Sequence, residues 1–189
     1  SAQSASAHLA KLVDGGLLLS EAQGRHRYFR IANADAANLI ESLASFGKSA
    51  RARTPQQPAL VRAMPSQFLH ARTCYDHLAG EMAVKVLQAM LKQRWLVADG
   101  HTYEATRLGA EKLSALGIDP NRERKARRTF ARGCVDLTQR RPHLAGVLGA
   151  ELLDLYVRQG WILRTARSRV VSITPKGNEA FKRKLGVVL

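Results

Sequence analysis

The chain has 189 residues, of which 30 are Lys or Arg and 15 are Asp or Glu, giving a formal net charge of +15. Hydrophobic residues make up 46% of it, enough to bury a core, which excludes wholesale disorder. No apolar run approaches the ~20 residues that cross a bilayer, and no signal peptide is visible. Two cysteines do not make a disulfide framework, so we expect a cytoplasmic protein with reduced thiols and no membrane partner. The large positive charge favours a polyanionic partner, most commonly nucleic acid.

The first 46 residues predict a helix, a β-hairpin and a second helix. The pair Gly15-Gly16 is typical of a helix end. The segments that we expect are a helix over residues 1–13, strands at Leu17–Leu19 and Tyr28–Ile31, a turn at Gln23–Arg27 and a closing helix at Asp35–Phe46. A helix followed by a hairpin is the second half of a winged helix-turn-helix, in which the helix lies in the major groove of DNA.

The side chains of this segment are of the kinds that contact DNA. The first residues of the helix are small or polar, as a groove-facing helix needs, and Leu9, Leu12 and Val13 would pack inward. A basic hairpin tip lies along a phosphate backbone or enters a minor groove. The candidate DNA-binding residues are Ser1, Gln3, Ser4, Ser6, His8 and Lys11 on the helix, and Arg25, His26, Arg27 and Tyr28 on the hairpin.

Three separated motifs in this segment resemble the ArsR/SmtB family of winged-helix repressors. They are Ser6-Ala7-His8-Leu9-Ala10-Lys11-Leu12, Gly16-Leu17-Leu18, and Gly24-Arg25-His26-Arg27-Tyr28-Phe29-Arg30-Ile31. The resemblance covers roughly residues 1–46 and implies a homodimeric repressor whose affinity for DNA changes when an inducer binds. It also implies helices ahead of the recognition helix, so we expect a further segment of about 40–50 residues before Ser1. The family's metal sites do not carry over, because the closing helix has no His and only Asp35 and Glu41 as acidic residues.

The rest of the chain repeats one supersecondary unit twice. His77-Leu78-Ala79-Gly80 recurs as His143-Leu144-Ala145-Gly146, and each copy is followed by a Trp, two β-prone stretches and a helix start. The apolar periodicity predicts a helix before each Trp, with Leu78 and Leu144 on its inner face. Thr106 and Thr174 are expected N-caps, with Pro175 at the first helical position. Trp95 and Trp161 are expected core residues.

Two connectors separate these units. Gly47 to Gln67 contains three prolines and predicts a linker, whereas Asn121 to Arg141 predicts a strongly basic helix. Residues 119–189 carry sixteen Lys or Arg against six Asp or Glu. This excess is either a source of further phosphate contacts or a solvated basic face. The helices of the repeats lack the polar display of a DNA reader, so we interpret them as degenerate winged helices serving in sensing or dimerisation.

The two cysteines occupy equivalent places in the repeats. Cys74 and Cys134 each begin a Cys-x-Asp motif shortly before the repeated His77 and His143. One hypothesis is a sensor in which these four residues bind a soft metal or metalloid. A second is a redox switch in which Arg72 and Arg132 lower a thiol pKa. A third is that both cysteines are small core residues repeated by duplication, with each His bonding locally. The sequence names no cofactor.

No catalytic motif is visible, so we do not expect an enzyme. The fold class that we predict is α+β and helix-rich, with tandem winged helix-turn-helix units. The domains that we expect are 1–48, a linker over 49–69, a winged-helix-like unit over 70–118, and a basic helix plus a second such unit over 119–189. The predicted function is an inducer-responsive, sequence-specific regulator of transcription that binds double-stranded DNA as a homodimer. The alternative is a module of tandem winged helices that binds a protein or RNA.

Overall fold

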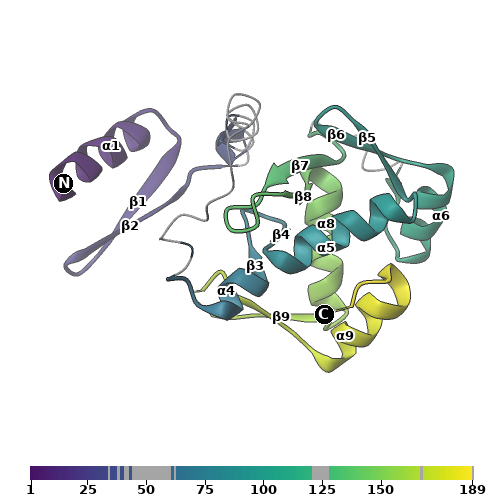
Figure 1. Ribbon diagram of the computed structural model, residues 1–189. Helices are drawn as coiled ribbons and strands as arrows, with labels where there is room; N and C mark the ends of the chain where they lie inside the picture. The colour runs from purple at the N-terminus through teal and green to yellow at the C-terminus, as the bar shows by residue number, and fades with distance from the viewer. Residues whose placement is uncertain are drawn as a thin grey trace. The chain divides into compact units, whose positions relative to one another are not determined.

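The computed structural model describes residues 1–33, 35–37, 39–40, 43, 61, 63–120, 128–166 and 168–188. They belong to two compact units, Ser1–Arg51 and Ala52–Leu189. The protein is mixed α/β, as expected at that level (Figure 1). Among the helices of these residues, none combines the length and the apolar character that a bilayer crossing requires.

The first unit contains the expected helix and hairpin. Helix α1 (Ala2–Asp14) begins at Ser1, whose hydroxyl accepts the backbone N–H of Ser4 at 3.3 Å. The antiparallel strands β1 (Leu18–Gln23) and β2 (His26–Ile31) are joined by a two-residue turn in which Gly24 has a φ of +59°. His26 and Arg27 therefore belong to β2, not to the turn where the sequence placed them.

The closing helix of the first unit is present at every residue of it that the structure describes. Residues 35–37, 39–40 and 43 are helical, and the remainder of the expected range Asp35–Phe46 lies outside the described residues. The Asn33 side chain caps this helix by accepting the backbone N–H of Ala36 at 2.8 Å.

The second unit is built from two copies of the same element order, hairpin–helix–hairpin–helix. The first copy follows α4 (Ser66–His70) and consists of β3 (Arg72–Thr73), β4 (Leu78–Ala79), α5 (Glu81–Lys92), β5 (Leu96–Asp99), β6 (Thr102–Ala105) and α6 (Arg107–Ala115). The second copy consists of β7 (Arg132–Val135), β8 (Pro142–Ala145), α8 (Gly146–Arg158), β9 (Ile162–Arg164), β10 (Val171–Ile173) and α9 (Pro175–Ala180), followed by the π-helix η1 (Phe181–Leu185). Helices α5 and α8 lie in the middle of the unit (Figure 1).

The two copies exchange their hairpins. The second hairpin of the first copy joins the first hairpin of the second copy in one sheet of order β5-β6-β7-β8. The backbone N–H of Tyr103 donates to the carbonyl of Ala131 at 2.9 Å, and in the equivalent place the N–H of Val171 donates to the carbonyl of Ala71 at 3.2 Å. The copies are thus related by an approximate two-fold arrangement, in which the second hairpin of each copy pairs with the first hairpin of the other.

The core and helix caps of this unit agree with the sequence. Trp95 and Trp161 are buried, and the hydroxyls of Thr106 and Thr174 accept the backbone N–H groups that begin α6 and α9. Two buried glycines, Gly109 and Gly177, let these helices approach the backbones of the two Trp residues more closely than any Cβ would allow. The expected N-caps and core anchors are confirmed.

Three expectations about this unit need correction. Residues 132–135 form strand β7, so the helix expected over 121–141 is wrong there, because pairing with β6 and β8 overrides a run with weak helix propensity. Residues 121–127 of that helix lie outside the described residues. Leu78 and Leu144 lie in strands β4 and β8 instead of on helices. Residues 66–69, assigned to the linker, belong to helix α4 (Ser66–His70).

Glycine explains why each repeated His-Leu-Ala-Gly motif changes from strand to helix. Gly80 and Gly146 have φ values of +93° and +83°. A Cβ on Gly80 would lie 2.7 Å from the carbonyl oxygen of His70, and one on Gly146 would lie 2.7 Å from that of Thr129. The backbone therefore turns at each glycine in a conformation that other residues rarely adopt.

Candidate functional site

The polar side chains of α1 are open to solvent. Ser1, Gln3, Ser4, Ser6, His8 and Lys11 are all exposed, and Leu9 and Val13 are half-buried. Leu12, which we expected to pack inward, is 39% exposed. The Ser6 hydroxyl donates to the carbonyl of Ala2 at 3.0 Å, which leaves its oxygen as an acceptor. The helix thus presents polar groups to solvent, as a DNA reader requires.

The hairpin places basic groups at its tip and on both faces of β2. Arg25 is exposed in the turn, and Arg27 is exposed at the start of β2. His26 and Tyr28 lie on the same face of β2, with their rings 6.3 Å apart, and Tyr28 is 54% exposed. Phe29, on the opposite face, is half-buried, so Tyr28 is the aromatic residue available to a ligand.

One residue of this face was missed in the sequence. Arg30 is exposed and follows His26 and Tyr28 at the two-residue spacing of a strand. The sequence alone could have predicted this, because every second residue of the expected strand, namely 26, 28 and 30, lies on the same face.

The second unit brings together four side chains that the sequence singled out. The ligand atoms of Cys74, His77, Cys134 and His143 all lie within 4.8 Å of one another. Cys74 is half-buried and the other three residues are buried. Both cysteines are thiols and not a disulfide. We call this set the Cys2His2 cluster.

The approximate two-fold arrangement explains how residues so distant in sequence meet. In the β3–β4 hairpin, Cys74 directly follows β3 and His77 directly precedes β4. In the β7–β8 hairpin, Cys134 and His143 face each other across the two paired strands. Each hairpin therefore places one Cys and one His close together. His77 and His143 meet at the approximate axis, where their Nε2 atoms are 3.1 Å apart. Each copy contributes one thiol and one imidazole.

A ring of carboxylates and guanidinium groups surrounds the cluster. His77 Nδ1 lies 3.1 Å from Asp76 Oδ1, and Asp76 Oδ2 accepts from Arg128 at 2.7 Å. His143 Nδ1 lies 3.6 Å from the Asp136 carboxylate, which accepts two bonds from Arg72, at 2.8 and 2.9 Å. Each imidazole is therefore backed by an acidic residue that is itself paired with an arginine.

Asp136 holds the two copies together. It accepts the backbone N–H of Gly80 at 2.7 Å and those of Thr138 and Gln139 at 2.8 and 2.9 Å. Burial raises the pKa of this carboxyl, but these N–H groups and the Arg72 guanidinium outweigh it and hold the pKa well below its usual range. Asp136 is therefore a buried anion.

The surroundings of Cys74 favour its thiolate. A hydrogen bond with Cys134 lowers the pKa of Cys74, burial opposes this, and hydrogen bonds with His143 and His77 lower it further, so that the pKa lies far below its ordinary value of 9.0. Arg72, which the redox hypothesis placed beside a thiol, bonds instead to Asp136. The carboxylates Asp76 and Asp136 and the residue Arg128 were missed as members of this site, although the repeated Cys-x-Asp motif contained the first two.

Sequence comparison identifies a relative that spans nearly the whole chain. A Bacillus subtilis (strain 168) protein named "Uncharacterized HTH-type transcriptional regulator YdfF" is 40% identical over 186 residues, which cover 98% of this chain and 80% of the relative. No protein-family model and no solved structure matches the chain. The chain belongs to the HTH-type transcriptional regulators. The function predicted from the sequence, a DNA-binding regulator of transcription, is confirmed at that level.

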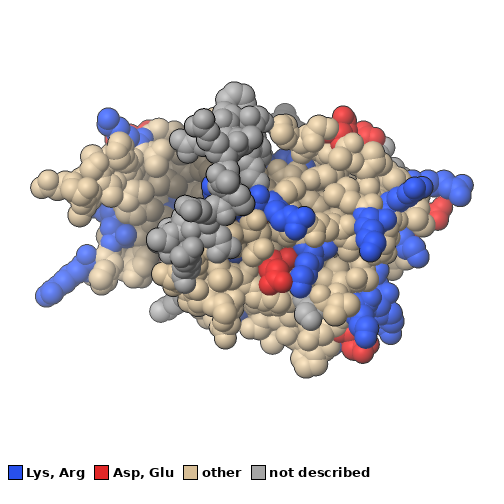
Figure 2. Space-filling model, viewed as in Figure 1, with Lys and Arg blue, Asp and Glu red and all other residues tan. Residues whose placement is uncertain are grey.

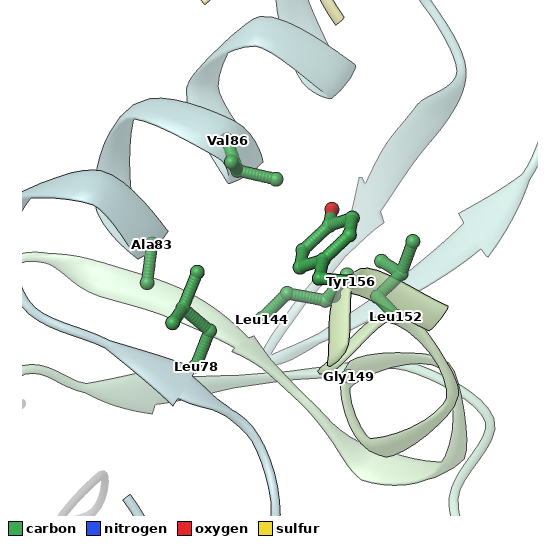
Figure 3. A pocket seen from close by; sticks show the side chains of 7 residues that line it. All are labelled: Leu78, Ala83, Val86, Leu144, Gly149, Leu152 and Tyr156. Atoms are coloured by element: carbon green, nitrogen blue, oxygen red, sulfur yellow. The ribbon is translucent and has the colours of Figure 1, made fainter. Parts of the chain in front are cut away.

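The regulator has a small apolar cavity between its two repeats. Equivalent residues of the two copies line it, namely Leu78 with Leu144, Ala83 with Gly149 and Val86 with Leu152, together with Tyr156 (Figure 3). Its volume of about 10 Å³ is roughly the space of one water molecule, so in this conformation it does not accommodate an organic inducer.

Basic side chains are spread over the second unit of the regulator. Figure 2 shows separate groups of Lys and Arg on the visible face, with fewer Asp and Glu between them. Lys182, Arg183 and Lys184 of η1 are exposed one after another. This distribution agrees with a solvated basic face and also offers phosphate contacts, so both interpretations of the excess charge stay open.

Proposed function

We propose that the first unit reads double-stranded DNA, with α1 in the major groove and the β1–β2 hairpin against the phosphate backbone. The observation that carries the proposal is the joint exposure of the polar side chains of α1 and of the basic hairpin. Among the side chains of α1, Gln3 suits a bidentate contact with adenine. Ser1, Ser4, Ser6, His8 and Lys11 would contact base edges or phosphates.

The hairpin would supply contacts that do not depend on base sequence. Arg25, Arg27 and Arg30 are exposed cations on a stiff two-stranded ribbon, and cations of this kind bind phosphates and release counterions. His26 and Tyr28 add hydrogen-bond donors on the same face of β2 as Arg30, whereas Arg27 lies on the opposite face. We expect these residues to set affinity and α1 to set base preference.

We further propose that the protein is an ArsR/SmtB-type repressor that acts as a homodimer in the cytoplasm and responds to an inducer. Leu39, Ile40 and Leu43 of the closing helix are 49%, 37% and 62% exposed, which supports a role for this helix in pairing two copies. A two-fold dimer would address two half-sites. The relative's name favours a regulator over an enzyme.

The second unit, in this proposal, is a pair of degenerate winged helices. Helices α5 and α8 occupy the places of recognition helices, but Met82 and Leu148 are completely buried and most of the other residues of α8 are buried too. Helices enclosed in a core do not enter a DNA groove. This unit therefore serves to sense a signal or to support the dimer.

Fluorescence anisotropy with labelled duplex DNA, measured over a range of salt concentrations, tests the reader. We expect Arg25→Ala to weaken binding to all sequences and to reduce the salt slope by about 1. Gln3→Ala should change the preferred base at one position of each half-site. Arg158→Ala is the matched control, because Arg158 is an exposed arginine on the second unit, with 59% of its side chain accessible.

Three results would contradict this assignment. They are binding that disappears in excess competitor DNA for every sequence tried, an Arg25→Ala variant that binds as the parent does, or a preference for RNA or for a protein partner. The last result would support the alternative, an interaction module. Sedimentation velocity of Leu43→Lys tests the dimer, and we expect the variant to be monomeric.

A further inference from the structure

We propose that the Cys2His2 cluster binds one divalent cation of the zinc class in tetrahedral coordination. The ligands would be the Sγ atoms of Cys74 and Cys134 and the Nε2 atoms of His77 and His143. The site differs in place and composition from the regions that the family resemblance pointed to. The proposal of metal binding depends only on the geometry of the Cys2His2 cluster. Any effect of the metal on DNA affinity depends in addition on the proposed function.

The spacing of the ligand atoms fits such a site. Zinc bonds of about 2.0–2.1 Å to nitrogen and about 2.3 Å to sulfur place tetrahedral ligands roughly 3.3–3.8 Å apart. The four ligand atoms all lie within 4.8 Å of one another, and the two Nε2 atoms are 3.1 Å apart. Movements of a few tenths of an ångström to about one ångström would complete the tetrahedron.

The hydrogen bonding of the two imidazoles points to a cation between them. A neutral imidazole has one N–H and one lone pair. The Asp76 carboxylate lies 3.1 Å from His77 Nδ1, which favours the N–H at Nδ1 on that ring and leaves its Nε2 lone pair facing His143 Nε2 at 3.1 Å. His143 Nδ1 lies 3.6 Å from the Asp136 carboxylate, beyond hydrogen-bond distance, and has no hydrogen-bond partner among the described residues. A metal ion between the two Nε2 atoms would bond both rings, and His143 Nδ1 would then carry the proton and face Asp136. Histidine ligands backed by carboxylates are the usual arrangement around protein-bound zinc.

The charge of the cluster selects a divalent ion. Two thiolates and two neutral imidazoles carry a charge of −2, so a divalent cation leaves the buried centre neutral. The surrounding ring is already balanced, because Arg128 pairs with Asp76 and Arg72 pairs with Asp136. A monovalent ion would leave an uncompensated negative charge among residues that are mostly buried. The mixed sulfur and nitrogen set disfavours magnesium and calcium, which take oxygen ligands.

The metal would tie together the two copies of the repeat. Cys74 and His77 come from the first copy, and Cys134 and His143 come from the second. Four protein ligands leave no open position, which is typical of a structural or regulatory zinc site and not of a catalytic one. Occupancy would therefore change the stability of the second unit.

Titration of the purified, reduced full chain with Co²⁺ and then Zn²⁺ tests the proposal. We expect one Co²⁺ per chain, with the d–d bands of tetrahedral cobalt and a thiolate-to-cobalt charge-transfer band, and loss of both when Zn²⁺ displaces it. Cys74→Ser should remove most of the charge-transfer intensity. Asp76→Asn should weaken binding by about 10–100-fold while keeping the spectrum. His101→Ala is the control, because His101 is an exposed histidine outside the cluster.

The same titration identifies the results that would overturn the proposal. They are the absence of a tetrahedral cobalt spectrum in chain shown by circular dichroism to be folded, a spectrum that Cys74→Ser leaves unchanged, or a disulfide between Cys74 and Cys134 in protein kept without oxygen. Should Cys74→Ser fail to fold, Asp76→Asn and Zn²⁺-dependent melting of the parent chain decide the question.

The experiments can refute DNA binding and metal binding separately. Arg25→Ala should lose DNA affinity and keep the cobalt spectrum, whereas Cys74→Ser should lose the spectrum and keep the salt-dependent DNA binding of the metal-free parent. A chain that binds Zn²⁺ but no DNA would refute the proposed function and leave the metal site intact.

Discussion

The two units of this protein place their chemistry in opposite environments. Helix α1 of the first unit has no buried residue, and its polar groups face solvent. In the second unit, Arg72, His77, Asp136 and His143 are each at most 1% exposed and bond to one another. An exposed polar helix needs only correct local structure, whereas the buried polar centre exists only if both repeats fold and pair. The comparison therefore predicts that single substitutions act locally in the first unit and globally in the second.

The largest effect is expected where the buried centre loses its anion. Asp136→Ala removes the partner of Arg72 and leaves that guanidinium buried without its carboxylate. We expect a loss of about 3–5 kcal/mol in the free energy of unfolding. Urea denaturation followed by Trp fluorescence measures it, and reports on the second unit alone, because the chain's two Trp residues, Trp95 and Trp161, both belong there.

An exposed ion pair provides the control for this change. Asp154 and Arg158 lie one helical turn apart on α8, at 3.2 Å, with side chains that are 62% and 59% exposed. Asp154→Asn should cost no more than about 0.5 kcal/mol. Equal losses for the two variants would show that the buried centre is no more important than a surface pair.

A second test compares the apolar residues of the two units. Leu148 is completely buried in α8, and Leu148→Ala should cost about 2–5 kcal/mol through lost burial and a new cavity. Leu19, in β1, is 42% exposed, and Leu19→Ala should leave the Trp transition unchanged. A shift of that transition in Leu19→Ala would mean that the units do not unfold independently.

The same contrast explains what the sequence could predict. The α1 helix, the hairpin and the caps Thr106 and Thr174 follow from local patterns, and they were predicted correctly. Repetition of the Cys-x-Asp and His-Leu-Ala-Gly motifs was sufficient to group Cys74, His77, Cys134 and His143. The bond from Arg72 to Asp136 and the strand at Arg132–Val135 depend on pairing between the repeats, which no local pattern contains.

Helix caps give a matched pair of intermediate changes. Thr174 caps α9 by accepting the N–H of Gly177 at 2.9 Å, and Thr174→Ala should cost about 1 kcal/mol in the Trp-monitored transition. Asn33 caps the closing helix of the first unit, so Asn33→Ala should speed amide hydrogen exchange in that helix without moving the Trp transition. Thr174→Ser should recover most of the loss, since serine is an equally good cap. A Trp transition that responds to Asn33→Ala would contradict the separation of the units.

The smallest effect is expected at Glu81, on the surface of the second unit. Lys85 donates to its carboxylate at 2.9 Å, and this bond is the main reason that the pKa of Glu81 lies below its ordinary 4.5. Because both side chains are more than a third exposed, Glu81→Gln should cost only about 0.3–0.5 kcal/mol near neutral pH.

This loss should depend on pH. Because the pKa of the Glu81 carboxyl is lower in the folded chain than in the unfolded chain, its ion pair stabilises the fold at pH values above the unfolded-state pKa. That stabilisation is lost as the pH falls through the folded-state pKa. The difference between variant and parent should therefore vanish in acid. Glu111→Gln is the control, because its partner Arg107 is 95% exposed and lies 3.6 Å away, and its loss near neutral pH should be smaller. If Glu81→Gln instead lowers the free energy of unfolding by more than about 1 kcal/mol in a pH-dependent way, the surface charge of the second unit is coupled to its buried polar centre.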